Sequence, residues 1–183
     1  MIHPEPRCDS EGLLYGAPCA YCKVKNRPVL YLDIDGCLNG HAFDYTAQSN
    51  TLKQECVGHL NRVLDATGCD IVLSSAWRYI IHGGAMTLQG FEYLLRTHLV
   101  GIGRKGRLVG ITEKDRDNGW PERVRLIRKH AAENNLKRYA VVDDGPLGEA
   151  GPDFPFVRCD GAIGMTAEDA DRLIEILGRE NEA

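Results

Sequence analysis

The chain has 183 residues, of which 43% are hydrophobic and 26% are charged, and its formal net charge is −4. This length suits one domain with a small appendage and a sizeable core. The negative charge argues against non-specific nucleic-acid binding, and no apolar run approaches the ~20 residues that cross a bilayer. The polar N-terminus lacks the apolar core of a signal peptide, so we expect a cytoplasmic protein.

Residues 1–26 read as a loop-rich extension with several Pro and Gly residues and no sustained periodicity. Three cysteines lie in it, at Cys8, Cys19 and Cys22, and His3 could be a fourth metal ligand. A Cys-x-x-Cys pair in such a segment could hold a structural Zn²⁺ ion. Free thiols or a redox pair are the alternatives. The other four cysteines are scattered singly, which is typical of reduced, buried thiols.

After the extension, strand and helix patterns alternate. Short apolar runs predict strands, and apolar residues three or four apart predict helices. In chain order we expect a strand at 28–33, a helix at 51–68, a strand at 69–75, a helix at 87–99, a short strand at 107–112, a helix at 121–135, strands at 138–144 and 154–159, and a helix at 166–183. Gly68 should close the first helix, Pro121 should open the third, and a Thr-x-x-Asp capping box should open the last.

The expected strands read as continuous apolar runs separated by helices, which indicates a parallel sheet covered on both faces. We therefore expect residues 27–183 to form one α/β domain, a Rossmann-like three-layer sandwich with a central parallel sheet. In such sheets ligands bind beyond the carboxyl ends of the strands.

Three of the expected strands end in pairs of polar residues at that edge: Asp33 with Asp35, Ser74 with Ser75, and Asp143 with Asp144. Side chains two apart on a strand point the same way, so Asp33 and Asp35 could address a common ligand. Carboxylates that close repel each other, and a divalent cation relieves the repulsion. Mg²⁺ prefers oxygen ligands, so these acids indicate a magnesium site and not a zinc site.

The strand ends read "DIDGCL" at 33–38, "IVLSS" at 71–75 and "AVVDD" at 140–144. In this order they resemble motifs I, II and IV of the haloacid dehalogenase (HAD) superfamily of phosphotransferases. The resemblance covers most of the chain, from about residue 28 to about residue 160. It implies a HAD-like fold and a phosphatase activity.

The resemblance also implies a role for each acid. Asp33 would be the nucleophile that forms an aspartyl-phosphate, and Asp35 would be the general acid and then the general base. A carboxylate at the second position is what the phosphatases and mutases of the superfamily carry. Mg²⁺ would be held by Asp33, the backbone carbonyl of Asp35, and Asp143, with Asp144 close by.

Motifs II and III would bind the phosphate. Ser74 would donate a hydrogen bond to a phosphate oxygen, and Ser75 is the alternative if the strand ends one residue later. Motif III should be a Lys or Arg near the start of the helix before motif IV. Arg123 is our choice, because it lies in the first turn of the helix at 121–135, 20 residues before Asp143. An Arg in a first turn is unfavourable with the helix dipole, which is a small sign of a functional role. Lys114 and Arg125 are the alternatives.

"SSAWR" at 74–78 resembles a small branch of the superfamily that includes phosphatase domains of RNA-repair proteins. The match extends through "GFEYLLRTHL" and "LVGIT". Arg78 could then clamp a second phosphate or the substrate backbone through its planar guanidinium. The alternative is that Trp77 packs in the core and Arg78 pairs with a neighbouring acid.

Members of the superfamily carry cap domains after motif I or motif II. The chain between Asp35 and the helix at 51–68 is too short for a folded cap, so we expect a capless or nearly capless domain. An open site admits macromolecular ends, whereas small substrates usually require a lid. The basic segment "GRKGR" at 103–107 could bind a phosphate backbone there.

Together these patterns predict a Mg²⁺-dependent phosphomonoesterase that acts on a nucleic-acid end or a nucleotide. One alternative keeps the chemistry but takes a small metabolite such as a sugar phosphate. Another is a non-catalytic protein that binds phosphorylated ligands. The oligomeric state is not predicted.

Overall fold

The structure is a computed structural model that describes residues 27–39, 52–98, 107–114 and 119–179, together with two short N-terminal strands. These two, β1 (Leu13–Leu14) and β2 (Ala17–Pro18), pair antiparallel and were not expected from the sequence. The predicted zinc ligands lie outside the described residues: Cys8, Cys19, Cys22 and His3. The same is true of most of the basic segment at 103–107.

Every strand and helix expected from residue 28 onward is present. The elements are β3 (Val29–Leu32), α2 (Gln54–Thr67), β4 (Asp70–Leu73), α3 (Arg78–His82), α4 (Leu88–Thr97), β5 (Leu108–Ile111), α5 (Trp120–Glu133), β6 (Tyr139–Asp143), the 3₁₀ helix η2 (Leu147–Ala150), β7 (Phe156–Arg158) and α6 (Ala167–Gly178). The short elements α3 and η2 are additional to the prediction.

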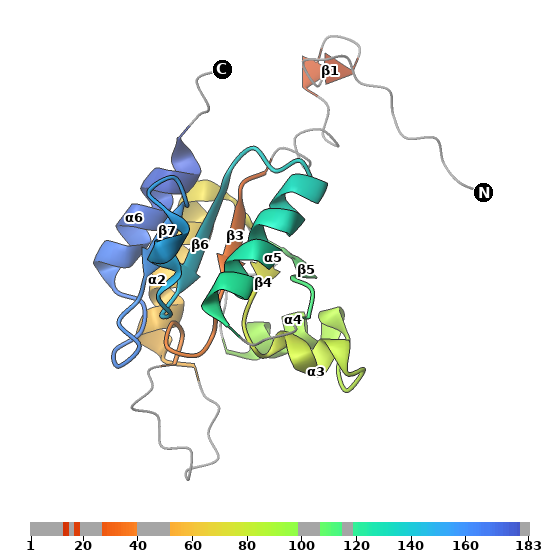
Figure 1. Cartoon of the computed structure of the whole chain (residues 1–183), viewed down its shortest axis with the longest axis vertical. Helices are drawn as coiled ribbons and strands as arrows, with labels where there is room; N and C mark the ends of the chain where they lie inside the picture. The colour runs from red at the N-terminus through yellow and green to blue at the C-terminus, as the bar shows by residue number, and fades with distance from the viewer. Residues whose placement is uncertain are drawn as a thin grey trace, which may run out of the picture.

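The five strands of the main body form one all-parallel sheet in the order β5-β4-β3-β6-β7. The chain moves outward from β3 to β4 and β5, then returns to the other side of β3 for β6 and β7. The strand order therefore reverses between β3 and β6, and this is the place where α/β sheets bind ligands. The predicted α/β sandwich is confirmed (Figure 1).

Helices cover both faces of the sheet, with α2, α4 and α6 on one face and α5 with η2 on the other (Figure 1). The side chains of β3 alternate between the two: Leu30 and Leu32 pack toward α2 and α6, whereas Val29 and Tyr31 pack toward α5. All four side chains are buried, as expected for a central parallel strand.

The helix ends follow the signals in the sequence. Gly68 caps α2 in the left-handed conformation with φ 62°, where glycine carries no steric penalty. At the start of α6, the Asp169 backbone N–H donates to Thr166 Oγ1 at 3.2 Å, and the Thr166 N–H donates to Asp169 Oδ2 at 2.9 Å. This is the predicted capping box.

The part of the chain that the structure describes contains no cap domain, and none of its helices is long and apolar enough to cross a membrane.

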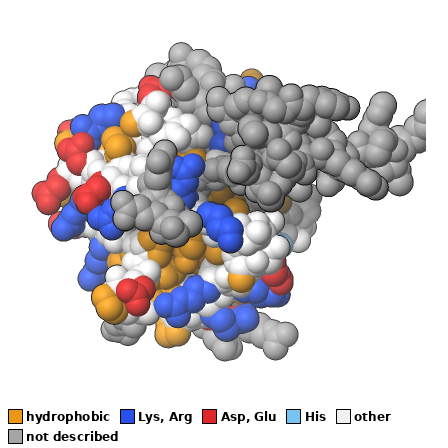
Figure 2. Space-filling model, turned by 90° about the horizontal axis from the view of Figure 1, so that it is seen from above, with side chains coloured by type: hydrophobic (Ala, Val, Ile, Leu, Met, Phe, Trp, Pro, Cys, Tyr) orange, Lys and Arg blue, Asp and Glu red, His pale blue; other side chains and the backbone are white. Residues whose placement is uncertain are grey.

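Figure 2 shows the molecule from above, where hydrophobic side chains gather in the middle of the face and Lys and Arg side chains lie beside them. Positive charge is therefore present on the surface in spite of the negative net charge.

The turn after β3 is fixed by the segment that leads into α6. The Met165 N–H donates to the Cys37 carbonyl oxygen at 2.8 Å. Gly164 makes this approach possible, because it has φ +88° and a Cβ there would lie 2.7 Å from Cys56 Sγ and 2.9 Å from the Cys37 oxygen. The turn that carries the first acidic motif is thus held by a segment far from it in the sequence.

We predict that Gly164→Ala lowers the free energy of unfolding more than Gly68→Ala does. Both glycines have positive φ, but no atom lies within 4 Å of a Cβ added to Gly68. Gly68→Ala should therefore cost about 1–2 kcal/mol of backbone strain, and Gly164→Ala roughly 1–3 kcal/mol more from overpacking. Urea unfolding of both variants measures the difference, and equal costs would contradict the close packing at Gly164.

Candidate active site

Three carboxylates meet where β3 and β6 end. Asp33 follows β3, Asp143 is the last residue of β6, and Asp144 comes next; one oxygen from each lies within 4.8 Å of the others. The adjacency follows from strand pairing, because the Asp33 N–H donates to the Val142 carbonyl oxygen at 3.0 Å. Asp33 and Asp143 are buried, and Asp144 is half-buried.

Arg123 reaches this cluster from the first turn of α5. Its Nη1 donates to Asp33 Oδ2 at 3.0 Å and to Asp143 Oδ2 at 2.5 Å. The two alternatives lie elsewhere: Arg125 is paired with Glu122 on the exposed side of α5, and Lys114 Nζ lies 6.0 Å from the centre of the Tyr79 ring. Of the three basic candidates for motif III, Arg123 is therefore the one that contacts the acids.

The cluster holds more carboxylates than positively charged groups. Burial, and to a lesser extent the neighbouring Asp143, together raise the pKa of Asp33 to about 6, against the opposing effects of Arg123, the Ser75 hydroxyl and the Ile34 N–H. Burial likewise raises the pKa of Asp143, while Arg123 and the Gly145 N–H oppose the shift. Three carboxylates and one guanidinium leave an excess of two negative charges when all are ionised.

This donor set fits a hard divalent cation. All three groups offer carboxylate oxygens, which Mg²⁺ prefers, and their excess charge matches its own. The predicted ligands Asp33, Asp143 and Asp144 are thus brought together in a possible metal-binding cluster. The side chain of Asp35 is not part of it, and the contribution of its backbone carbonyl stays a prediction.

The carboxylate of Asp35 is held by two neutral donors. Trp77 Nε1 donates to Oδ2 at 2.9 Å, and Asn39 Nδ2 donates to Oδ1 at 2.8 Å. The Trp77 ring packs edge-on against the buried ring of Phe91, with the centroids 5.9 Å apart. Trp77 therefore packs, as one reading of the sequence expected, but its indole N–H also reaches the second acid of the first motif.

The two serines lie beside Asp33 in different ways. The Ser74 N–H donates to the Leu32 carbonyl oxygen at 3.0 Å, so Ser74 is next to Asp33 in the sheet register, and both serines are buried. Within the described ranges, Ser74 Oγ has no hydrogen-bond partner. The Ser75 hydroxyl forms a hydrogen bond with Asp33, and it accepts another from the backbone N–H of Trp77 at 3.3 Å.

Arg78 is almost fully buried, with 1% of its surface exposed. Its Nη1 donates to the carbonyl oxygens of Ser74 at 2.8 Å and Ser75 at 2.7 Å, and its Nε donates to that of Glu113 at 3.2 Å. These bonds tie the end of β4 to the segment after β5. A direct contact with substrate stays a prediction.

A cavity of about 300 Å³ lies between α5 and the segment after β6. It is lined by Trp120, Pro121, Val124, Arg128, Pro146, Leu147 and Ala150. The Trp120 ring is 40% exposed, packs on Gly145 so closely that a Cβ has no room there, and stacks on Arg123 with Cζ 5.1 Å from the ring centroid. An aromatic surface thus adjoins the residue that binds both acids.

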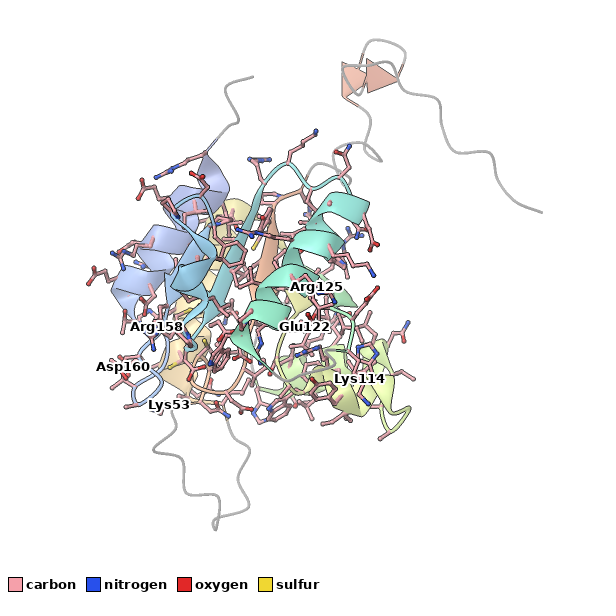
Figure 3. The ribbon with its side chains drawn as sticks, viewed as in Figure 1. Lys53, Lys114, Glu122, Arg125, Arg158 and Asp160 are labelled. Atoms are coloured by element: carbon pink, nitrogen blue, oxygen red, sulfur yellow. The ribbon has the colours of Figure 1, made fainter. Side chains whose placement is uncertain are left out.

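Basic and acidic side chains both lie at this end of the molecule (Figure 3). Figure 3 shows Lys53, Lys114, Arg125 and Arg158 spread across the lower half of the view, where β3 and β6 end, together with the acidic Glu122 and Asp160. Arg158 also supports the cluster, because its Nε donates to the Asp144 carbonyl oxygen at 3.0 Å.

Sequence reasoning missed the contacts of Trp77 and Asn39 with Asp35 and the stacking of Trp120 on Arg123. Asn39 lies four residues after Asp35, but Trp77 lies 42 residues away, so only the pairing of β3 with β4 brings its indole to that carboxylate. A tryptophan after a buried strand reads as a packing residue, and no local pattern marks its N–H.

The family model for the HAD domain in Swiss Army Knife RNA repair proteins matches residues 29–170, which is most of the chain. No match was found among curated proteins or among solved structures.

We predict that Asp33→Asn folds normally and, at pH 7.5 in EDTA, melts at the same temperature as the wild type or higher. The pKa of Asp33 rises from 3.8 to about 6 on folding, so the ionised form is disfavoured in the folded state. Stability is lost as the pH rises through this window, and the cost is complete above about pH 6. Removing the charge should thus recover about 1–3 kcal/mol at pH 7.5.

The advantage of Asp33→Asn should shrink as the pH falls toward 4, because the folded wild type is then protonated at Asp33. Thermal melting at pH 7.5 and pH 5 in EDTA measures it. A markedly lower melting temperature of the variant at pH 7.5 would show instead that the Asp33 carboxylate is needed for folding.

Proposed function

Because the chain belongs to the family of HAD domains in Swiss Army Knife RNA repair proteins, we propose that it is a Mg²⁺-dependent phosphomonoesterase that acts on a nucleic-acid end or a nucleotide. The observation that carries this proposal is the cluster of Asp33, Asp143 and Asp144 at the β3–β6 switch point, with Arg123 bound to two of them. The cluster brings together a carboxylate that can attack phosphorus, oxygen ligands for a metal ion and the positively charged guanidinium of Arg123.

In the first step, an oxygen of Asp33 attacks phosphorus while the bond from phosphorus to the leaving oxygen breaks. Asp35 gives its proton to that oxygen, which leaves as an alcohol. In the second step, Asp35 takes a proton from water, the water oxygen attacks phosphorus, and the bond to Asp33 breaks. Inorganic phosphate is released, and Asp33 and Asp35 return to their starting states.

Arg123 would neutralise part of the phosphate charge at the point of attack, since its guanidinium already lies 3.0 Å from Asp33 Oδ2. Mg²⁺ bound to Asp33, Asp143 and Asp144 would supply the remaining positive charge. The buried hydroxyl of Ser74 supports a role of this residue in phosphate binding. It has no hydrogen-bond partner in the described part of the chain, which costs free energy unless a ligand forms the missing hydrogen bond.

The substrate class is supported by the surroundings of the cluster. Trp120 offers a half-exposed ring beside Arg123, and bases stack on such rings. Lys53, Lys114 and Arg158 at the same end of the molecule could contact further phosphates (Figure 3). No described domain covers the site, which suits a macromolecular end.

The proposal is tested by hydrolysis of p-nitrophenyl phosphate and glycerol phosphate by the purified protein, with Mg²⁺ and with EDTA. We expect turnover that requires Mg²⁺ and falls by at least about 10³-fold in Asp33→Asn, because the covalent step is lost. Absence of turnover with Mg²⁺, while phosphorylated ligands still bind, would favour the non-catalytic alternative.

We predict that Trp120→Ala raises the KM for a phosphorylated oligonucleotide about tenfold, as expected for loss of one stacked base. Glycerol phosphate has no ring, so its kcat/KM should change by less than about twofold. Tyr93→Ala is the matched control, because Tyr93 is an exposed aromatic residue of α4, which packs on the other face of the sheet, and it does not line the cavity. Equal losses for both substrates would mean that Trp120 acts through Arg123 and not on a base.

A further inference from the structure

We propose that Trp77 is a positioning residue for Asp35: its indole N–H holds the general acid in the orientation that delivers a proton to the leaving oxygen. This inference rests on the proposed function, since it assigns Asp35 the proton transfers of both steps. It concerns a contact between the ends of β3 and β4 that the acidic cluster itself does not explain.

Asp35 lies beyond the last residue of β3, where the strand no longer fixes its side chain. Two hydrogen bonds do so instead, from Trp77 Nε1 at 2.9 Å and Asn39 Nδ2 at 2.8 Å, one to each oxygen. Asn39 belongs to the same turn as Asp35, with which it also forms an isolated β-bridge. Trp77 belongs to the segment after β4, so its bond is the one that fixes the carboxylate relative to the rest of the site.

Trp77 is itself held on two sides. Its backbone N–H donates to Ser75 Oγ at 3.3 Å, and its ring packs at 73° against Phe91, which is fully buried in the main core. The indole therefore has a rigid support, which a positioning group requires. Ser75 also hydrogen-bonds Asp33, so one short segment contacts both acids of the first motif.

The chemistry of the two donors suits a group that must release a proton. An indole N–H can donate but cannot accept, so Trp77 orients the carboxyl group without taking its proton. The carbonyl oxygen of the Asn39 side chain already accepts from the Gly36 N–H at 3.1 Å. Neither Trp77 nor Asn39 therefore has to accept a hydrogen bond from a protonated Asp35, and its proton is available to the leaving oxygen.

The test is Trp77→Phe, which removes the N–H and keeps an aromatic ring against Phe91. Glycerol phosphate has a poor leaving group that needs the acid, whereas p-nitrophenyl phosphate has a good one that needs it little. We expect kcat/KM to fall about tenfold for glycerol phosphate, a part of the 10²–10⁴-fold that general acids contribute, and by less than about twofold for p-nitrophenyl phosphate.

Leu64→Ala is the control, because Leu64 is buried in the same core but lies before the start of β4, whereas Trp77 lies after its end. It should lower the melting temperature without changing the ratio of the two kcat/KM values. Equal losses for both substrates in Trp77→Phe, or the same change of ratio in Leu64→Ala, would overturn the inference while the proposed function stands. A wild type that hydrolyses neither substrate with Mg²⁺ would overturn the proposed function and the inference together.

A second measurement does not depend on activity. The indole N–H resonance of Trp77, assigned by its loss in Trp77→Phe, should exchange slowly with solvent in the wild type and faster in Asp35→Ala. Equal exchange rates in the two proteins would show that the hydrogen bond to Asp35 is not made, and would overturn the inference.

Discussion

The contact of Arg123 with Asp33 and Asp143 is the interaction on which the site depends. Pairing of β3 with β6 forces two carboxylates together in a buried place, where their mutual repulsion and desolvation oppose folding. One guanidinium between them offsets part of this cost. Because it cannot neutralise three acids, an excess of negative charge remains for a divalent cation. The charge excess that opposes folding is thus the same one that a divalent cation would relieve.

The elements of the fold could be predicted because each has a local cause. The apolar run at 29–32 and the capping box of Thr166 and Asp169 are visible in a short window of sequence. The helix α3 is not, because it has five residues, too few for a periodic pattern. Its first residue, Arg78, is fixed by carbonyl oxygens at the ends of two strands, and this is a property of the tertiary structure.

The sequence predicts those residues of the site that lie at the carboxyl ends of strands. Asp33 and Asp143 could be chosen because acids rarely follow buried strands without a ligand. Arg123 and Arg125 are two positions apart in one helical turn, and the structure directs only the former to the acids and the latter to Glu122. Trp77 could not be assigned in this way, since its contact with Asp35 depends on where two neighbouring strands end and not on either motif alone.

The hydrogen bond from the Met165 N–H to the Cys37 carbonyl has a consequence for synthesis of the chain. Asp33 is translated well before Met165, so the turn that follows Asp33 cannot be fixed until this later segment has left the ribosome. A nascent chain therefore contains Asp33 before it can form the surroundings of that acid. These surroundings are completed only when the segment that leads into α6 is in place.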